Sequence, residues 1–496
     1  MHEQQQAVPL ANAGRSVIVP LIIRGEIIQS DLVTFHVRHG DVTFATPNVR
    51  LYAHRLPLAN PSDLGDYYQI SLDDILDFLV ALGARLDFRK NPYLQECFEL
   101  SMAASGLTEP ILRHMFEKGL QRMFRRAQLE EIIDRNIGRE YLEGWVRVPL
   151  LSGALGEVRA FGARGIHIVP GNAVLAAGVT VIRCALTRSD AIIKSPSNDP
   201  MTHAAVVRTM IDMDRNHPVT RHLSVAYWKG GDQDIEQLLY QARNVEKIVA
   251  WGGMNSIKHI ARYIQPGIDL ITLEPKLSSS IIGREAFSDE ATMRDAAALL
   301  ALDVGGLNQE ACASSRVVYA DTGTDDVGLE RVNRFGQLLY EAVMRLPEQI
   351  STKPKEFNQN LASELDALSL DDLYFKLIGG LDREGAVIVS QIPEPVDFAR
   401  ELSGRVANIV PVDDVDTAIR SVNAYTQTIG IYPDRLKEQI RDRLALHGAQ
   451  RVVSLGLALS PMLTLPQDAM EPLRRMCRWV AGETGRADRT TGILAD

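Results

Sequence analysis

The sequence predicts an α/β fold built around a parallel, doubly wound sheet. Between residues 158 and 274, short buried-type strands alternate with helical segments. This alternation is typical of parallel sheets that helices cover on both faces. It returns after residue 276, with strand-like segments at Val317–Tyr319 and Ala386–Ser390. Because 496 residues are too many for one ordinary core, we expect more than one domain.

The first third of the chain is expected to be a small β-rich segment followed by helices. Strands are predicted within 16–26 and at 42–45, and a helix capped by Ser71 follows. Helical patterns then continue to about residue 136. The next predicted elements are strands within 158–168 and at 191–194, 223–228, 247–251 and 270–274, with helices at 173–186, 202–212 and 235–242.

The second half repeats this organisation around a single cysteine. A helix is predicted at 290–303, before Cys312, and another at 331–346, whereas 353–370 is polar and partly irregular. Strands are expected at 407–412 and 451–455, and a final helix at 470–481. We predict domains at 1–125 (β-rich lead-in and helices), 126–275, 276–400 (with Cys312) and 401–496.

Composition and charge exclude several classes of protein. The hydrophobic fraction of 46% and the charged fraction of 23% are ordinary for a globular protein. A formal net charge of -10 argues against a general nucleic-acid binder, which needs clustered Lys and Arg. The N-terminus shows no signal-peptide pattern, and no apolar window is long enough to span a membrane. We therefore expect a cytoplasmic protein without a membrane span.

The four cysteines, at 97, 184, 312 and 477, are far apart and show no C-x-x-C spacing. A disulfide framework or a metal site is therefore not expected, and a reducing compartment is favoured. Cys312 stands out because Leu307–Arg316 surrounds it with small and amide-bearing residues just before a predicted strand. One interpretation is a catalytic thiolate that attacks a carbonyl or thioester. The alternative is a buried cysteine that acts as a small hydrophobe.

Polar residues also follow the predicted strands of the first sheet. Lys194, the pair Gly252–Gly253 and Glu274 lie at carboxyl ends of strands, where ligands bind in such sheets. The sequence has no Gly-x-Gly-x-x-Gly fingerprint and no Walker loop. Lys194 could pair with a ribose or a 2′-phosphate, and Ser197 adds a hydroxyl without negative charge. The glycine pair could let a pyrophosphate approach backbone amides. The alternative for Lys194 is an ordinary solvated lysine, and the alternative for the glycine pair is an ordinary turn.

Asn172 and Glu274 are further candidates for chemistry. Asn172 lies on a Pro-Gly loop, where its amide could stabilise a developing oxyanion or could simply form the turn. Glu274 closes a predicted buried strand and could be a general base or a solvent-facing acid.

Taken in order, these segments resemble the aldehyde dehydrogenase superfamily, and most closely its LuxC-type acyl-CoA reductases, which make long-chain aldehyde. The resemblance covers about residues 15–480. It implies a Rossmann-type NAD(P)-binding domain at 126–275 and an α/β catalytic domain at 276–400. It also implies that 401–496 returns to the cofactor domain and supplies a small β oligomerisation element. The segments that carry it are Ile168–Asn172, Ile192–Ser197, Trp251–Gly253, Leu273–Lys276 and Asn308–Cys312.

The resemblance also implies roles for matching residues. Cys312 would be the nucleophile, and the amide of Asn172 would form the oxyanion hole with the Cys312 backbone N–H. Lys194 would hold the adenosine ribose. Ser197 stands where many NAD-preferring relatives carry glutamate, which favours NADPH, with NADH as the alternative. Glu401 would contact the nicotinamide ribose, although Arg405 replaces the usual proline nearby.

The implied activity is reduction of an acyl-CoA or acyl-carrier-protein thioester to a fatty aldehyde through a Cys312 acyl-enzyme. Glu274 matches the general base of hydrolytic relatives, so an aldehyde dehydrogenase that makes acid is one alternative. A non-reducing subunit that carries an acyl group on Cys312 is another. The resemblance further implies a dimer or tetramer and admits an acyl-transferring partner enzyme.

Overall fold

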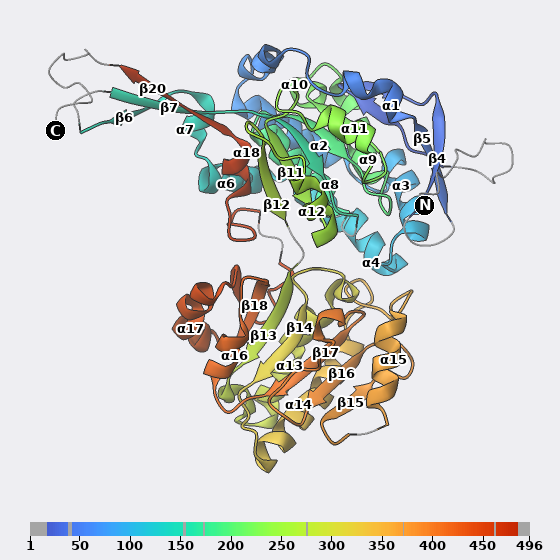
Figure 1. Ribbon diagram of the computed structural model, residues 1–496, viewed down its shortest axis with the longest axis vertical. Coiled ribbons are helices and arrows are strands. Elements are labelled where there is room, and N and C mark those ends of the chain that lie inside the picture. Colours follow the sequence, from blue (N-terminus) through green and yellow to red (C-terminus); the bar gives the residue numbers. More distant parts are fainter. Residues whose placement is uncertain are drawn as a thin grey trace.

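The computed structural model describes residues 17–37, 42–151, 155–171, 174–273, 276–370, 372–460 and 463–484. They form two lobes, one above the other in Figure 1, each built around its own seven-stranded sheet. This arrangement confirms the predicted α/β class.

The first sheet is mixed, with a parallel centre and an antiparallel edge formed by the N-terminal strands. Its strands, in spatial order, are β12 (Asp269–Leu273), β11 (Lys247–Trp251), β8 (Arg164–Ile168), β9 (Asp190–Lys194), β10 (Leu223–Ala226), β2 (Leu21–Ile23) and β3 (Glu26–Ile28). All the predicted strands between 158 and 274 are present. The antiparallel edge was not predicted, because local patterns do not reveal which strand pairs with which.

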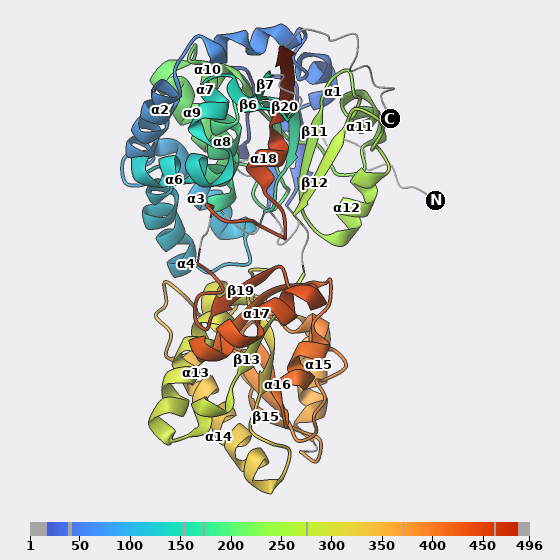
Figure 2. The same ribbon diagram turned by 90° about the vertical axis from the view of Figure 1, so that its left-hand side faces the viewer.

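Helices cover both faces of this sheet (Figure 2). Neighbouring side chains of β9 point to opposite faces, as a strand requires. Ile193 packs in the core with α8 and α9, whereas Ile192 packs with α11 and α12. These helices are α8 (Leu175–Leu186), α9 (Thr202–Asp214), α11 (Gln233–Leu239) and α12 (Met254–Ala261).

The N-terminal helices enlarge the core on the α8 side. The Ser71 hydroxyl accepts from the Asp74 N–H at 3.1 Å, and the Asp74 carboxylate accepts from the Ser71 N–H at 2.8 Å. This capping box confirms the predicted start of α2. The helices before β8 are α1 (Val49–Tyr52), α2 (Leu72–Arg85), α3 (Pro92–Ala104), α4 (Glu109–His114), α5 (Leu120–Arg122), α6 (Arg126–Asn136) and α7 (Arg139–Glu143); α10 (Pro218–Arg221) precedes β10.

A three-stranded sheet lies at the edge of the first lobe. In it β5 (Thr43–Pro47) pairs with β1 (Val17–Ile18) on one side and with β4 (Leu32–His36) on the other. Phe44 of β5 and Phe35 of β4 pack their rings against Tyr227, the residue after β10. This contact fixes β4 beside the carboxyl end of β10.

The second sheet contains the strand that follows Cys312. In spatial order its strands are β15 (Phe375–Gly379), β16 (Ala386–Ser390), β17 (Val406–Pro411), β14 (Ser315–Ala320), β13 (Leu277–Ile282), β18 (Thr426–Tyr432) and β19 (Arg451–Ser454). Only β15 runs antiparallel to its neighbour among these described strands. The strands from 406 to 454 thus belong to the same sheet as β14. The predicted domain limits stay predictions.

Helices pack on both faces of the second sheet. They are α13 (Glu290–Gly305) and α14 (Asp326–Met344) on one face, and α15 (Gln359–Leu368), α16 (Val415–Ser421) and α17 (Asp434–His447) on the other. The helix α15 falls in the segment expected to be irregular. It forms because Asn358 caps its first N–H groups and because Leu361 and Leu365, at helical spacing, are buried.

The predicted helix at 470–481 is wrong. The structure has a short α18 (Pro472–Met476) and then β20 (Arg478–Thr484), which pairs antiparallel with β7 (Leu155–Phe161). β7 also pairs with β6 (Val146–Pro149), and the three strands project from the first lobe as an arm (Figure 1). Pairing with a distant strand outweighs the local helical pattern here. Among the described residues, no helix is both long and apolar enough to cross a bilayer.

Candidate active site

The functional candidates of both lobes face the junction between them. β12 ends at Leu273 and β13 begins at Leu277, so the carboxyl edge of the first sheet lies opposite the amino edge of the second (Figure 1). β8, β9, β10 and β11 run parallel with β12 and share that edge. Cys312 lies just before β14 and therefore at the facing edge of the second sheet.

A pocket of about 370 Å³ opens beyond β9 and β10. Lys194, the last residue of β9, and Ser197 both line it, so two of the predicted cofactor residues lie together. The other lining residues come from β4 and from the loop after β10: Thr34, Phe35, His36, Tyr227, Trp228, Lys229 and Gly230. Within the described residues, this lining has two lysines and a histidine but no carboxylate. The set suits a ligand with an aromatic ring and negative charge.

Lys194 is held among aromatic rings. Its Nζ lies 5.8 Å from the Tyr227 ring centroid and 5.5 Å from that of Trp228. Burial lowers the pKa of Lys194 to about 8, and the buried carboxylate of Glu236 opposes this shift. An anion bound in the pocket would favour the charged lysine.

The glycine pair follows β11, as expected. Gly253 is the N-cap of α12, and a Cβ on Gly253 would meet no atom within 4 Å. A Cβ on Gly252 would meet only Ser256, at 3.6 Å. The protein's own packing therefore does not demand glycine at either position. Both residues lie outside the lining of the 370 Å³ pocket.

The chain before Cys312 has an unusual backbone. Leu307, Asn308 and Gln309 have φ values of 53°, 53° and 65°, in the left-handed region that non-glycine residues seldom adopt. Such conformations cost about 1–3 kcal/mol each and persist only where the surroundings impose them. Cys312 itself is free and half-buried, whereas Cys97, Cys184 and Cys477 are buried.

Two side-chain amides impose this conformation. Gln309 Nε2 donates to the carbonyl oxygens of Ser315 at 2.9 Å and Val406 at 2.8 Å. Its Oε1 accepts from the Val406 N–H at 2.9 Å, so one buried side chain ties the starts of β14 and β17 together. Asn308 Nδ2 donates to the Thr352 hydroxyl at 3.2 Å, and Asn308 Oδ1 accepts from the Thr352 N–H at 2.8 Å.

Ser278 supports Cys312 from the neighbouring strand. Its hydroxyl donates to the Cys312 carbonyl oxygen at 2.8 Å and accepts from the Thr428 N–H at 3.2 Å. The register of β13 shifts at this residue against both β14 and β18. Such irregularities in a sheet often re-aim a side chain beside an active site.

The thiol of Cys312 is not intrinsically acidic. Burial raises its pKa, the side-chain amide of Gln427 lowers it, Asp468 raises it and Arg316 lowers it, with a net upward shift. A cysteine nucleophile reacts as the thiolate, so a bound ligand or a donor at the sulfur must favour that form.

Glu401 lies on an exposed 3₁₀ turn, Ala399–Glu401, before β17. The next residue, Leu402, accepts from Arg316 Nε at 2.7 Å, which holds this turn close to the start of β14. Arg405 is buried with φ 71° and donates to the Val343 carbonyl at 2.8 Å. Proline cannot adopt a positive φ, so this backbone conformation could not accommodate the proline expected from the resemblance.

Asn172 and Glu274 lie outside the described residues. Their roles in the oxyanion hole and in proton transfer stay predictions. The structure instead adds residues that the sequence did not suggest: Ser278, Gln427, Asp468 and the pocket residues His36 and Lys229. They come from strands and turns far apart in the chain, and none belongs to a local motif.

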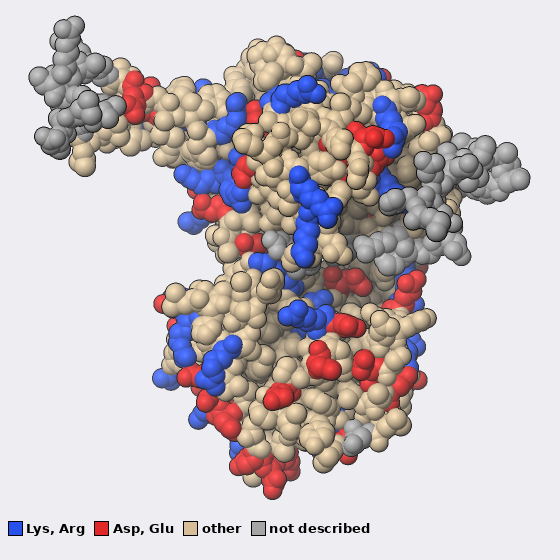
Figure 3. Space-filling view, viewed as in Figure 1, with Lys and Arg blue, Asp and Glu red and all other residues tan. Residues whose placement is uncertain are grey.

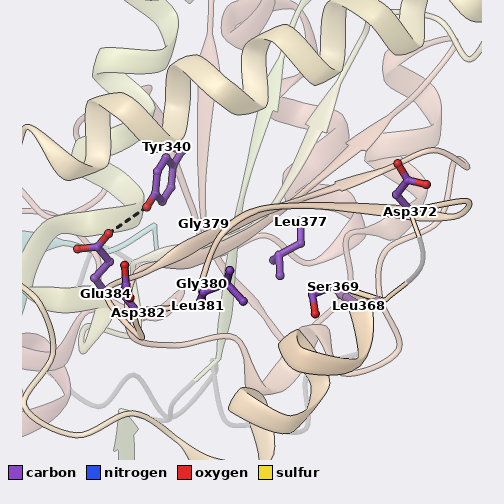
Figure 4. A pocket seen from close by; sticks show the side chains of 10 residues that line it. All are labelled: Tyr340, Leu368, Ser369, Asp372, Leu377, Gly379, Gly380, Leu381, Asp382 and Glu384. Atoms are coloured by element: carbon purple, nitrogen blue, oxygen red, sulfur yellow. Dashed lines mark hydrogen bonds between the residues drawn. The ribbon is translucent and has the colours of Figure 1, made fainter.

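A second pocket, of about 410 Å³, lies in the second lobe beside β15 (Figure 4). Its lining includes Asp372, Asp382 and Glu384, and the Glu384 carboxylate accepts from the Tyr340 hydroxyl at 3.1 Å. None of the predicted site residues lines it. Within the described ranges, no group of His, Cys, Asp and Glu is arranged to hold a metal ion.

Charged side chains of both signs are interspersed over both lobes on the face shown in Figure 3. That face carries no broad basic surface of the kind that tracks a nucleic-acid backbone.

Comparison with known proteins gives one family. The family model of the acyl-CoA reductases (LuxC) matches residues 68–479. A long-chain acyl-protein thioester reductase of Vibrio harveyi is 25% identical over 477 residues, which cover 94% of this chain and 93% of that protein. A long-chain acyl-protein thioester reductase of Aliivibrio fischeri is 27% identical over 432 residues, covering 85% of this chain and 84% of that protein.

Solved structures show the same fold at low sequence identity. The NADP-dependent glyceraldehyde-3-phosphate dehydrogenase of Bacillus halodurans C-125, complexed with NADP, superposes with a TM-score of 0.71 at 14% identity, covering 95% of this chain and 99% of that one. Aldehyde dehydrogenase 21 from Physcomitrella patens gives a TM-score of 0.71 at 14% identity, covering 97% and 100%. The predicted aldehyde-dehydrogenase-like fold is therefore confirmed.

Proposed function

Since this chain belongs to the acyl-CoA reductase (LuxC) family and is an oxidoreductase, we propose that it reduces an acyl thioester to the aldehyde through an acyl-enzyme on Cys312. The observation that carries the proposal is the place of Cys312. Of the four cysteines it alone is not buried, and it lies in a strained, tightly tied loop at the junction of the lobes. Strain held at one site by its surroundings is a feature of active sites.

The substrate is a long-chain acyl group carried on CoA or on a protein thiol. The names of the relatives, long-chain acyl-protein thioester reductases, support the chain length and the protein-bound form. The family description supports CoA. Both leaving groups are thiols, so the chemistry at Cys312 is the same.

The reaction proceeds in two steps. The Cys312 sulfur attacks the thioester carbonyl, and the carbon–sulfur bond to the leaving thiol breaks as that thiol takes up a proton. The Cys312 backbone N–H donates to the developing oxyanion, and the side-chain amide of Asn172 is predicted to donate to it as well. When bound, the reduced nicotinamide supplies the hydride that turns the enzyme thioester into a thiohemiacetal. The Cys312 sulfur then leaves, and the aldehyde is released. Glu274 would transfer protons to the leaving thiol or to the alkoxide.

NADPH is the proposed cofactor. Lys194, Lys229 and His36 line the pocket at the ends of β9 and β10, and Ser197 adds no negative charge there. A 2′-phosphate would find cationic donors and no repelling carboxylate among the described lining residues. Gly252 and Gly253 are proposed to lie beside the pyrophosphate, and Glu401 beside the nicotinamide ribose.

The projecting arm supports a further proposal, a dimer or tetramer. Trp145, Leu151 and Val480, on or beside its strands, are 42%, 110% and 38% exposed. Apolar side chains on a projecting sheet are favourable to bury against a second copy. Light scattering should give a mass of at least two chains, and Val480→Asp should lower it.

Intact-mass spectrometry tests the reaction. After mixing with palmitoyl-CoA, the protein should gain one acyl group, and Cys312→Ala should gain none while the control Cys477→Ala still does. Added NADPH should discharge the acyl group as aldehyde. Acid formation from aldehyde and NADP⁺ would support the dehydrogenase alternative. Acylation without any reduction would support the acyl-carrying subunit.

A further inference from the structure

Glu236 of α11 is a buried carboxylate close to the proposed cofactor pocket. It is only 2% exposed, and three groups converge on its two oxygens. Oε1 accepts from the Gly231 N–H at 3.0 Å, and Oε2 accepts from the Tyr263 hydroxyl at 3.1 Å and lies 2.6 Å from His259 Nε2. An ionised carboxylate only accepts hydrogen bonds, so His259 donates through Nε2. These contacts compensate for the burial of the carboxylate.

The Gly231 N–H belongs to the loop that forms one side of the pocket. Lys229 and Gly230 line the pocket, and Gly231 is the next residue. The Asp232 N–H donates to the Lys229 carbonyl at 3.1 Å, which closes a turn around the two glycines. Gly231 has φ 87°, which glycine adopts without steric cost. Glu236 therefore fixes this loop at the point where it leaves the pocket.

The other two donors belong to α12 and the segment after it. His259 is in the last turn of α12, and Tyr263 follows the helix. The Tyr263 ring also packs edge-on against Tyr240 at the end of α11, with 5.1 Å between the ring centroids. The N-cap of α12 is Gly253, which is proposed to lie beside the pyrophosphate. Glu236 thus links the pocket loop to the helix that begins after Gly253.

Glu236 also acts on Lys194 through its charge. Burial lowers the pKa of Lys194 to about 8, and the negative charge of Glu236 acts in the opposite direction. Without that charge, less of Lys194 would be protonated at neutral pH. Glu236 is not among the described residues that line the pocket. It therefore acts on a bound ligand only through the groups that it holds.

We propose that Glu236 is a positioning residue for the cofactor, whose carboxylate holds the pocket loop and α12 at the spacing at which one ligand contacts both. The inference rests on the proposed function, because it takes the pocket to be the NADPH site. It further implies that loss of Glu236 disturbs the loop and the helix together. Loss of His259 should disturb the helix alone.

Isothermal titration calorimetry with two ligands tests the proposal without turnover. One ligand is NADPH, and the other is adenosine 2′-monophosphate, which has no pyrophosphate. Glu236→Leu removes the acceptor of all three contacts, so the Kd for both ligands should rise about tenfold or more. Glu236→Gln keeps the size and one acceptor oxygen, so the Kd should rise about threefold, and this variant replaces Glu236→Leu if the latter does not fold.

Glu246→Leu is the matched control. Glu246 also accepts a backbone N–H, that of Arg164 at 2.7 Å, and pairs with the Arg164 guanidinium at 3.1 Å. It precedes β11, at the amino edge of the same sheet and opposite to the pocket. The control should lower the Tm and keep both Kd values. In steady-state kinetics, Glu236→Leu should raise the KM for NADPH and keep kcat at saturation close to that of the wild type.

His259→Phe weakens the link to α12 and leaves the Gly231 hydrogen bond in place. The Kd for NADPH should rise about threefold, whereas the Kd for adenosine 2′-monophosphate should not change. Equal effects on the two ligands would overturn the division between loop and helix. If the wild type binds neither ligand, the proposed cofactor fails and the inference with it. If the wild type binds both and the folded Glu236 variants bind them as tightly, the inference alone fails.

Discussion

The two sheets carry their candidate functional residues at opposite ends of their strands. In the first sheet, Lys194 and Ser197 come at and beyond the carboxyl end of β9. In the second, Cys312 precedes β14, and Ser278, which donates to the Cys312 carbonyl, is at the amino end of β13. Ligands in open parallel sheets bind beyond carboxyl ends. The pocket at Lys194 follows this rule. The Cys312 site is at the amino edge of its own sheet, and it faces the carboxyl edge of the first sheet across the junction.

The two sites also differ in what holds them. The proposed cofactor pocket is built from short runs that follow strands, with aromatic and basic residues adjacent in the sequence, such as Tyr227, Trp228 and Lys229. The Cys312 loop is held by single side chains that reach across the sheet, such as Gln309 to Val406. Substitutions should therefore act locally in the first site and cooperatively in the second.

The largest expected effect comes from Gln309→Leu. It leaves the Val406 N–H and the carbonyl groups of Ser315 and Val406 buried without this partner. We expect the free energy of unfolding to fall by about 2–4 kcal/mol in urea titration. Aldehyde formation should fall by about 100-fold, because displacement of a nucleophile by about 1 Å costs that much. Gln391→Leu, which breaks side-chain bonds to Asn333 elsewhere in the same lobe, should lower stability and spare turnover. Equal turnover in both variants would contradict the cooperative account of the loop.

A smaller effect is expected from Lys194→Met. Loss of a charge-assisted hydrogen bond costs about 1.5–3 kcal/mol, so the KM for NADPH should rise about tenfold or more. The kcat at saturating NADPH should stay close to that of the wild type, since Lys194 is proposed to contact the adenosine ribose and not the reacting atoms. Steady-state kinetics with a fixed acyl-CoA concentration checks both values. A fall in kcat without a change in KM would show that the pocket is not the cofactor site.

Ser197→Glu should change cofactor preference rather than activity. A carboxylate beside Lys194 would repel a 2′-phosphate, so the kcat/KM ratio of NADPH to NADH should fall about tenfold. Ser197→Gln, of the same size but neutral, is the control and should change the ratio much less. If both variants shift the ratio equally, size and not charge decides the preference.

The smallest effect concerns a buried cluster in the first lobe, away from both sites. His222 Nδ1 lies 3.0 Å from Asp190 Oδ1, and its Nε2 lies 2.8 Å from Asp66 Oδ1. Burial lowers the pKa of His222, but the hydrogen bonds to Asp190 and Asp66 outweigh it and raise the pKa above its ordinary value. Protonated His222 therefore stabilises the fold fully below about pH 6.5 and loses that contribution as the pH rises through the folded pKa.

Thermal unfolding tests the direction of this pH dependence. The difference in Tm between the wild type and His222→Gln should be largest near pH 6 and should shrink toward pH 9. The exposed His54→Gln should show no such trend. A Tm difference that grows with pH would contradict the raised pKa.

Much of the fold could be predicted from the sequence because buried strands carry their signal locally. The predicted strand 247–251 and the strand at Ala386–Ser390 are confirmed with the same limits. The chain after 470 could not be predicted, because β20 exists only through its pairing with β7. The Cys312 site was only partly predictable: Cys312 has a recognisable neighbourhood, whereas Ser278 reaches it through folding alone.

The pairing of β20 with β7 also bears on synthesis. The strands of the second lobe, from β13 to β19, lie in the chain between these two partners. On a ribosome, the second sheet is complete before the arm of the first lobe can receive its last strand. Domains generally fold as units during synthesis, the N-terminal one first. Here the second lobe can be completed first, and the edge of β7 stays unpaired until β20 has been synthesised.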